Sequence, residues 1–185
     1  MSIVLNSAGG GSITLNEPNT ASNRVLELPN NSGTLISTGS TFAGNGPAFS
    51  ASRTADQSIS SSTWTKVALN VEAFDTNSCF DSTTNYRFTP NVAGYYQVNG
   101  RLFGGGSSVV STYVAIYKNG SLTAQAGVGV GSGTVGVIPQ IADVIYFNGT
   151  TDYVELYGYV AGTSPIFSAA TGQFCVFSAS MVRAA

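Results

Sequence analysis

The sequence predicts an all-β fold, an antiparallel jelly-roll sandwich preceded by an extended N-terminal arm. Apolar residues occur in short runs bounded by Gly, Pro, Asn or Asp, the pattern of strands that end in turns. No stretch repeats its apolar residues with the period of a helix. Hydrophobic residues make up 43% of the chain and charged residues only 9%, a balance typical of β-rich surface proteins and opposite to that of a disordered chain.

Residues 1–46 differ from the rest, and we interpret them as a docking or trimerising arm. Their apolar clusters are short and are separated by Gly, Pro, Asn and Ser. Isolated short strands are marginal in water, so these clusters need a surface to cover them, whether their own domain, sister copies or a partner. A disordered tail is the alternative that the Gly and Asn content leaves open. The residues expected to dock are Ile3, Leu5, Ile13, Leu15, Val25, Leu26, Leu28, Leu35 and Ile36.

Residues 47–185 show longer apolar runs at regular spacing, which predicts one jelly-roll domain. Each run is bounded by turn-forming residues, and none shows sustained helical periodicity. The predicted strands are 48–53, 63–74, 85–88, 94–103, 111–118, 122–128, 135–147, 151–160 and 173–182.

Turn signals and Gly-rich runs divide these strands. The pairs Asn119-Gly120 and Asn148-Gly149 predict tight hairpins, because both residues tolerate positive φ. The segments around 104–110, 127–136 and 161–172 are expected to be loops at the distal end, free for contact.

The residue types argue against catalysis. The chain contains no His, which excludes Ser-His-Asp and Cys-His mechanisms and removes the commonest metal ligand. The carboxylates are spaced singly, although folding could still bring two of them together. Asp75 or Asp81 could hold calcium on a loop, but without the spacing of a calcium loop the capping of polar turns is favoured. We therefore expect no enzyme activity and no cofactor.

Charge and cysteine usage limit the partners. The seven Lys and Arg residues are scattered singly, so no footprint for nucleic acid or anionic lipid is present. No apolar run is long enough to insert into a membrane and no secretory signal is recognisable, so we expect a soluble protein made in a cytoplasm. Cys79 and Cys175 are far apart in sequence and are expected to be free buried thiols.

Tyrosines alternate with aliphatic residues in YVELYGYV, residues 153–160. In a strand this spacing places Tyr153, Tyr157 and Tyr159 on one face, with the aliphatic residues on the other. One face suits a core and the other suits an interface between copies, although a core strand buried on both faces remains open.

The segment FDSTTNYRFTPNVAGYYQVNGRL, residues 80–102, resembles the central signature of the C1q and tumour-necrosis-factor-like jelly roll. Weaker resemblance extends over residues 48–185, while Gly100 stands where the family usually has an aromatic residue, and no collagen-like repeat precedes the domain. The resemblance is carried by Phe80, Asp81, Thr84, Tyr86, Phe88, Pro90, Gly94, Tyr96, Val98 and Leu102.

This resemblance implies a compact homotrimer that forms through the inner sheet. Combined with strand parity, it predicts Tyr95, Gln97, Tyr153 and Tyr157 near the threefold interface. The residues of opposite parity form the predicted core: Tyr96, Val98, Leu102, Val154 and Leu156.

The arm segment GSITLNEPNTASNRVLELPNNSGTLISTGS resembles a segment that recurs in structural proteins and fibres of tailed bacteriophages. The matching residues are Ile13, Thr14, Leu15, Pro18, Ala21, Ser22, Asn23, Leu26, Leu28, Pro29, Gly33, Thr34, Leu35, Ser37 and Thr38.

Together the two resemblances imply a non-enzymatic trimeric protein of the virion surface, made in the cytoplasm of a host bacterium. As a capsid decoration or cement protein, it would dock on capsid proteins through its arm and stabilise the particle. The alternative is a tail-fibre or receptor-binding protein that joins tail proteins and recognises a host glycan or protein through its distal loops. A lectin-like binding module unrelated to a virion is the third reading.

Overall fold

A computed structural model describes most of the chain, which divides into two units, residues 1–36 and 37–185. Each unit is described by itself, and the predicted domain boundary after residue 46 stays a prediction. The described residues are 2–6, 8–16, 46–169 and 174–185.

The first unit contains an antiparallel hairpin of β1 (Ser2–Asn6) and β2 (Ser12–Asn16). Two pairs of predicted docking residues face each other across it in register, Ile3 with Leu15 and Leu5 with Ile13. The other predicted docking residues lie outside the described part of the chain: Val25, Leu26, Leu28, Leu35 and Ile36.

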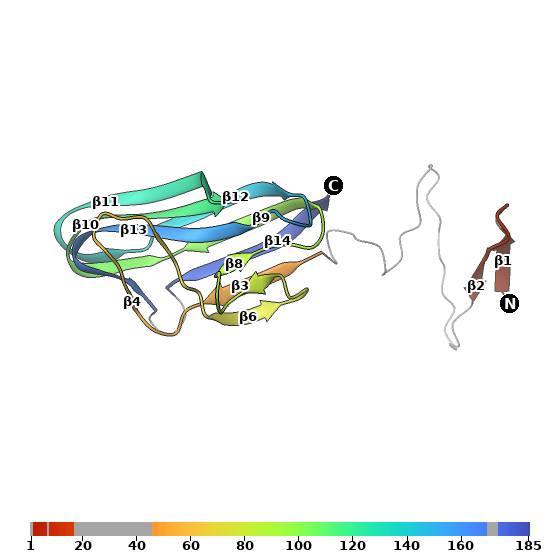
Figure 1. The fold of residues 1–185 in the computed structure, drawn as a ribbon, viewed down its shortest axis with the longest axis horizontal. Coiled ribbons are helices and arrows are strands. Elements are labelled where there is room, and N and C mark those ends of the chain that lie inside the picture. The colour runs from red at the N-terminus through yellow and green to blue at the C-terminus, as the bar shows by residue number, and fades with distance from the viewer. Residues whose placement is uncertain (1, 7, 17–45, 170–173) are drawn as a thin grey trace, which may run out of the picture. The chain divides into compact units, whose positions relative to one another are not determined.

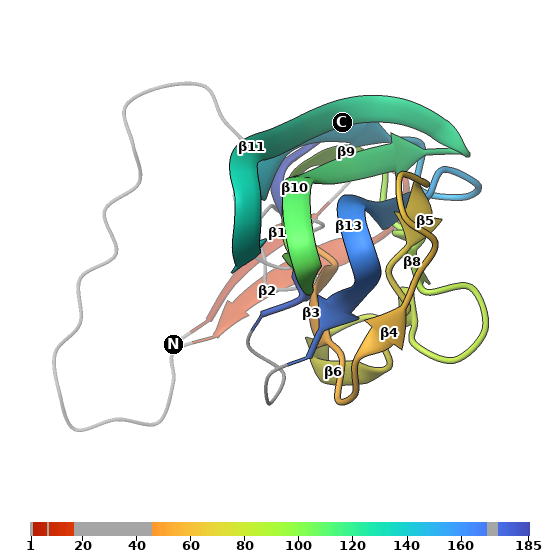
Figure 2. The ribbon, with the colours of Figure 1, turned by 90° about the vertical axis from the view of Figure 1, so that its left-hand side faces the viewer.

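The second unit is an antiparallel sandwich of two sheets that enclose one core, as predicted (Figures 1 and 2). One sheet has five strands in the order β12-β9-β14-β3-β6. Their bounds are β3 Ala48–Ser52, β6 Val71–Asp75, β9 Gly94–Arg101, β12 Gln140–Phe147 and β14 Val176–Ala184.

The other sheet has seven strands, with a main order of β11-β10-β13-β8-β7, and the short strands β4 and β5 also pair with β13. β11 forms one edge and bends along its length in the view of Figure 2. The bounds are β4 Gln57–Ser58, β5 Thr65–Lys66, β7 Phe80–Asp81, β8 Arg87–Phe88, β10 Phe103–Lys118, β11 Ser121–Val137 and β13 Val154–Ser168.

The core between the sheets follows strand parity. In β9 buried and more exposed residues alternate along the whole strand, because successive side chains point to opposite faces. Burying each large apolar side chain contributes about 1.5–3 kcal/mol. The predicted core residues Tyr96, Val98, Leu102, Val154 and Leu156 are all fully buried, so this prediction is confirmed.

The resemblance leads one to expect an aromatic residue at position 100, but this chain has Gly100 there. Gly100 is buried, and a Cβ atom placed there would clash with Cδ1 of Leu156 and press against Ile141. The side chain of Leu156 therefore occupies the space beside the glycine.

The two ends of the sandwich differ. The terminal end holds Gly46, the start of β9 and the C-terminal residues, and Met181 N donates to the carbonyl of Pro47 there. At the far end lie Arg101, Gln140 and Val176, which are partners across the five-stranded sheet. Two of the segments predicted to be distal loops, around 104–110 and 161–172, also lie at this end. Phe103 and Ser168, which adjoin or belong to these segments, pair with each other there.

Those segments are strands and not loops, which corrects the prediction for 104–110, 127–136 and 161–168. β10, β11 and β13 run through them, and register shifts between Gly105 and Ser111 mark irregular pairing. The glycines of these segments suggested loops. However, β10 is paired on both sides, so backbone hydrogen bonds hold the strand although its glycines have no side chains to pack.

Further predictions were wrong in detail, among them the single strand at 135–147, which divides into the end of β11 and β12 in different sheets. The run 63–74 forms not one strand but β5 and β6, which belong to different sheets, because the chain crosses between them. Asn148-Gly149 likewise begins a crossing between sheets and not a hairpin.

By contrast, Asn119-Gly120 does join β10 to β11 as a tight hairpin, and Lys118 pairs with Ser121 around it. Both turn residues have positive φ, 52° and 79°, which matches a type I′ turn and confirms the prediction.

Candidate functional site

The outward face of the five-stranded sheet carries an apolar patch near the terminal end, which we define as Tyr95, Val144, Tyr146 and Val182. Each is exposed, Val144 by 52% and both tyrosines by 43%. The ring centroids of Tyr95 and Tyr146 lie 5.4 Å apart, because the two residues are partners across β9 and β12. Large apolar side chains on neighbouring strands thus form one exposed surface, typical of a protein interface.

Toward the far end the same face becomes small and polar. Asn99 is flanked in register by Ala142 and Ser178, the smallest side chains on this part of the face. A depression of about 300 Å³ lies there, between β12, β9 and β14. Its outward lining side chains are Asn99, Arg101, Gln140, Ala142, Val176 and Ser178.

The flank beside this face lacks charge over residues 119–142. It is formed by β11, the edge of the seven-stranded sheet, and β12, the edge of the five-stranded sheet. Residues 119–142 contain no charged residue, and Leu122, Val128 and Ile138 are exposed within them. We call this surface the uncharged flank. The sequence analysis missed it, although the long gap between charged residues was a signal that could have found it.

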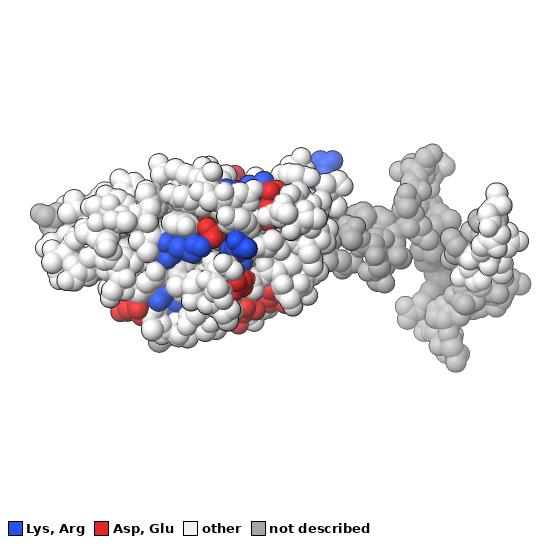
Figure 3. Space-filling view, in the orientation of Figure 1, with Lys and Arg blue, Asp and Glu red and all other residues white. Residues whose placement is uncertain are grey.

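Charges gather elsewhere on the molecule. Figure 3 shows Lys, Arg, Asp and Glu over β13, β8 and β6, while the surface over β10 and β11 is white. In this charged area Lys66 pairs with Glu155, whose side chain is only 6% exposed, and also donates to the carbonyl of Asn85. On the face seen in Figure 3, charged side chains therefore gather away from β10 and β11.

A second group of aromatic residues lies on the outward face of the seven-stranded sheet. Tyr117 stacks on Tyr157 at 4.2 Å between ring centroids, and Tyr113 meets Tyr159 edge-on at 5.6 Å. Trp64 lies 5.6 Å from the ring of Tyr159 and 6.3 Å from those of Tyr113 and Tyr117. All five are partly buried, so this cluster is largely covered by its own members.

The structure does not bring the four predicted interface residues together. Tyr95 and Gln97 lie on β9, on the outward face that holds the apolar patch. Tyr157 lies on β13 in the other sheet, and Tyr153 directly precedes that strand, under the guanidinium of Arg87 at 4.4 Å. The role of these residues in a trimer stays a prediction, and only the first two adjoin the exposed patch.

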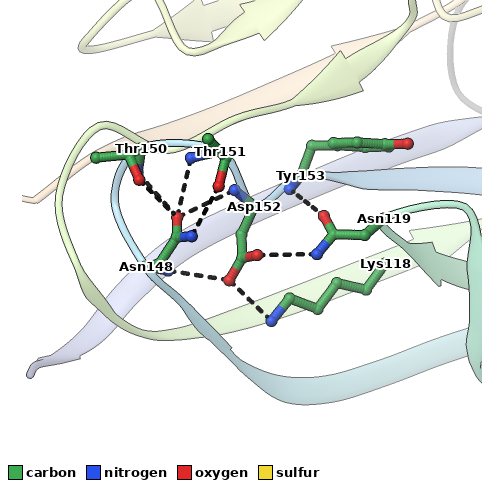
Figure 4. A network of polar contacts seen from close by, with 7 residues as sticks. All are labelled: Lys118, Asn119, Asn148, Thr150, Thr151, Asp152 and Tyr153. Atoms are coloured by element: carbon green, nitrogen blue, oxygen red, sulfur yellow. Dashed lines mark hydrogen bonds and ion pairs between the residues drawn. The ribbon is translucent and has the colours of Figure 1, made fainter.

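A polar network fixes the crossing from β12 to β13 (Figure 4). The side-chain oxygen of Asn148 accepts hydrogen bonds from the backbone N–H groups of Thr150, Thr151 and Asp152. The carboxylate of Asp152 accepts from Asn119 Nδ2 at 2.8 Å, which lowers the pKa of Asp152 below its usual value.

The same network ties the hairpin to this crossing. Lys118 lies 3.0 Å from the carboxylate of Asp152, and Asn119 accepts a hydrogen bond from the backbone N–H of Tyr153. The polar side chains are used to join backbone segments, which is a structural task.

Other groups offer little chemistry. Both cysteines are free and buried, as predicted, and burial raises the pKa of Cys175 to about 11, which keeps the thiol protonated. Within the described ranges no group of three or more Cys, Asp or Glu residues could hold a metal ion. Nor does that part of the chain contain a helix long and apolar enough to cross a membrane.

Comparison with solved structures places the domain in a known fold. Murine APRIL matches with a TM-score of 0.58 at 8% identity over 74% of this chain and 99% of its own. Eiger TNF from S. frugiperda matches with a TM-score of 0.58 at 10% identity over 78% of this chain and 94% of its own. No protein-family model and no curated protein sequence matches the chain. The second unit is thus a TNF-like jelly roll, and the likeness concerns the fold alone.

Proposed function

We propose that the protein is a non-enzymatic homotrimer of a bacteriophage virion surface, a capsid decoration protein that docks through its N-terminal arm. The single observation that supports the proposed homotrimer is that the apolar patch and the uncharged flank adjoin each other. The phage setting rests on the resemblance of the arm segment described above.

The two surfaces suit a ring. The apolar patch lies on a sheet face and the uncharged flank on the neighbouring sheet edges, so one copy can place its flank on the face of the next. Such a head-to-tail contact joins two different surfaces, and repeated by rotation it closes into a ring. A homotrimer of this kind covers Tyr95, Tyr146 and Leu122, which are exposed in the single chain.

The hairpin of the first unit supports the docking role. A two-stranded sheet is marginal by itself, and both of its strands present an edge that can pair with further strands. Paired positions that carry Ile and Leu alternate with Val4, which is 52% exposed. A capsid protein that offers a sheet edge would complete this small sheet by strand addition.

The absence of enzyme activity is proposed from what the ionisable groups do. Glu155 is engaged by Lys66, and Asp152 by Asn119 and Lys118. The side chain of the buried Arg53 donates to the carbonyls of Ala55 and Ala68. These groups are used to hold the fold, which argues against a catalytic role for them.

A tail-fibre protein is the second candidate, favoured by the likeness of the arm to fibre segments. The two roles differ in copy number, which quantitative mass spectrometry of purified virions measures. Hundreds of copies per particle support decoration, whereas a few to a few dozen contradict it and support the fibre. Absence from the particle contradicts both.

Removal of residues 1–46 tests the arm. We expect the remaining jelly roll to form a trimer that no longer joins particles, as measured by co-sedimentation with capsids that lack the protein. Full-length chain is the positive control. Capsid binding by the truncated protein would contradict the docking role.

A further inference from the structure

We propose that the open edge of β6 binds an extended segment of a different protein, a strand in which apolar and basic side chains alternate. This contact lies outside the proposed function, because β6 and β12 are opposite edges of the five-stranded sheet and neither the arm nor the assembly uses β6. Three properties of the strand point to such a partner, namely its exposure, its register and its charge.

β6 is exposed although it belongs to the sandwich. Residues 71–74 are all exposed, and the strand pairs with β3 on one side only, so its other side presents open backbone groups. Val71 is exposed by 38% and Phe74 by 51%. Phe74 is the only exposed phenylalanine in the described part of the chain, and unlike a tyrosine it has no hydroxyl group for water to bind. An apolar side chain therefore stands beside an open strand edge.

A bulge places the two large apolar side chains of β6 on one face. Phe74 pairs with Ser50 on β3, Val71 pairs with Ser52, and the register shifts between these two pairs. Without the shift, the odd spacing of Val71 and Phe74 would put them on opposite faces. Both serines alternate with the buried Ala51, so this shared face is the outward one. The serines are small and leave the apolar surface uncovered.

The other parity of β6 is acidic. Glu72 and Asp75 pair with core residues of β3 and so lie on the opposite face from the two apolar side chains. Glu72 accepts a hydrogen bond from the hydroxyl group of Ser82, and Asp75 accepts one from the backbone N–H of Phe80 at 2.7 Å. These bonds fix the carboxylates without neutralising them, and no ion pair within the described part of the chain involves either one. Figure 3 shows acidic side chains over β6.

Together these properties select the chemistry of the partner. A strand added to a sheet edge binds through its backbone and places alternate side chains on the two faces. Apolar side chains of the partner then lie beside Phe74, and basic ones lie beside Glu72, where opposite charges stabilise the pairing. A second copy of β6 is disfavoured, because it brings acids of its own to the same edge. The partner that fits is therefore a basic and apolar segment of another protein.

Fluorescence anisotropy tests the proposal with the full chain and a short labelled peptide of alternating Lys and Val. We expect this peptide to bind, and its affinity to fall as salt is raised. One comparison peptide carries Glu in place of Lys, and another keeps the sequence but has methylated backbone nitrogens that cannot donate to a strand. Each should bind about tenfold more weakly or less.

Two variants place the contact on β6. Glu72→Gln keeps the oxygen that accepts from Ser82 and removes only the charge, so binding should weaken about threefold and depend less on salt. Phe74→Ser removes the exposed ring and should weaken binding about tenfold. Leu122→Ser is the matched control, because Leu122 is a large exposed side chain on β11, an edge of the other sheet, and it should change affinity less than about twofold.

Failure of the Lys-Val peptide to bind would overturn the proposal, and is the result expected if the charges of β6 serve only to prevent pairing. Equal affinity for either comparison peptide, or unchanged binding in both β6 variants, would overturn it as well. Light scattering of the same samples separates this contact from the trimer, because β6 is complete within one copy. A monomeric chain that binds the peptide contradicts only the proposed trimer, whereas a trimer that does not bind it contradicts only this contact.

Discussion

The two sheets each display tyrosines on their outward faces, but the tyrosines of one face are partly buried and those of the other are exposed. On the seven-stranded sheet Trp64 packs among Tyr113, Tyr117 and Tyr159, and every ring of that cluster is partly buried. On the five-stranded sheet nothing within the described chain covers Tyr95 and Tyr146, which stay exposed by 43%. Outward tyrosines therefore indicate an interface only where no other part of the same chain covers them.

Val144→Asp should give the largest effect, because it places a charge in the surface that we propose is covered by a neighbouring copy. Burial of an unpaired charge costs about 3–5 kcal/mol, so the trimer dissociation constant should rise about a hundredfold or more. Analytical ultracentrifugation measures this. Val71→Asp is the matched control, because Val71 is exposed on β6, the other edge of the same sheet. Equal effects of the two substitutions would contradict the assembly surface.

Trp64→Ala should destabilise the fold while leaving the trimer intact. The substitution removes a partly buried ring that contacts three tyrosines, so we expect a loss of about 2–3 kcal/mol in the free energy of unfolding. Urea denaturation at fixed protein concentration gives the value, and light scattering gives the oligomeric state. If the variant became monomeric without losing stability, the aromatic cluster would be an interface and the contrast between the two faces would be wrong.

Asp152→Asn should have the smallest effect, and it should depend on pH. The folded state lowers the pKa of Asp152, chiefly through the hydrogen bond from Asn119, so its charge stabilises the fold above the unfolded pKa of about 4. This contribution is lost as the pH falls through the folded pKa. Thermal unfolding from pH 7 down to pH 2 should show a shallower acid loss in the variant. An unchanged profile would show that the network in Figure 4 does not depend on this charge.

Much of the fold could be predicted because strand parity is a local property. The alternation around Tyr96 and Val98 identified the core, and Asn119-Gly120 identified its hairpin, since both depend on neighbours in sequence. The glycine-rich strands at the far end were missed because their stability comes from pairing with distant strands. The same limit applies to Asn148-Gly149, where the chain leaves one sheet for the other.

The candidate site was harder to predict for a related reason. Parity placed Tyr95 and Tyr157 outward with equal justification, but it could not say which would be covered. The cover over Tyr157 comes from the cluster around Trp64, at the start of a run predicted to be one strand. The depression depends on Ala142 and Ser178 meeting beside Asn99, a register that no sequence pattern indicated.

The long edge formed by β11 has a consequence for how the protein must be made. Natural edge strands usually carry charges or proline that discourage pairing with foreign chains, and Ser121–Val137 has neither. If copies assemble as we propose, a newly folded single copy would be most prone to aggregate before assembly covers this edge. In the proposed assembly a neighbouring copy covers this edge, so assembly itself would replace the charges or proline that other edge strands use.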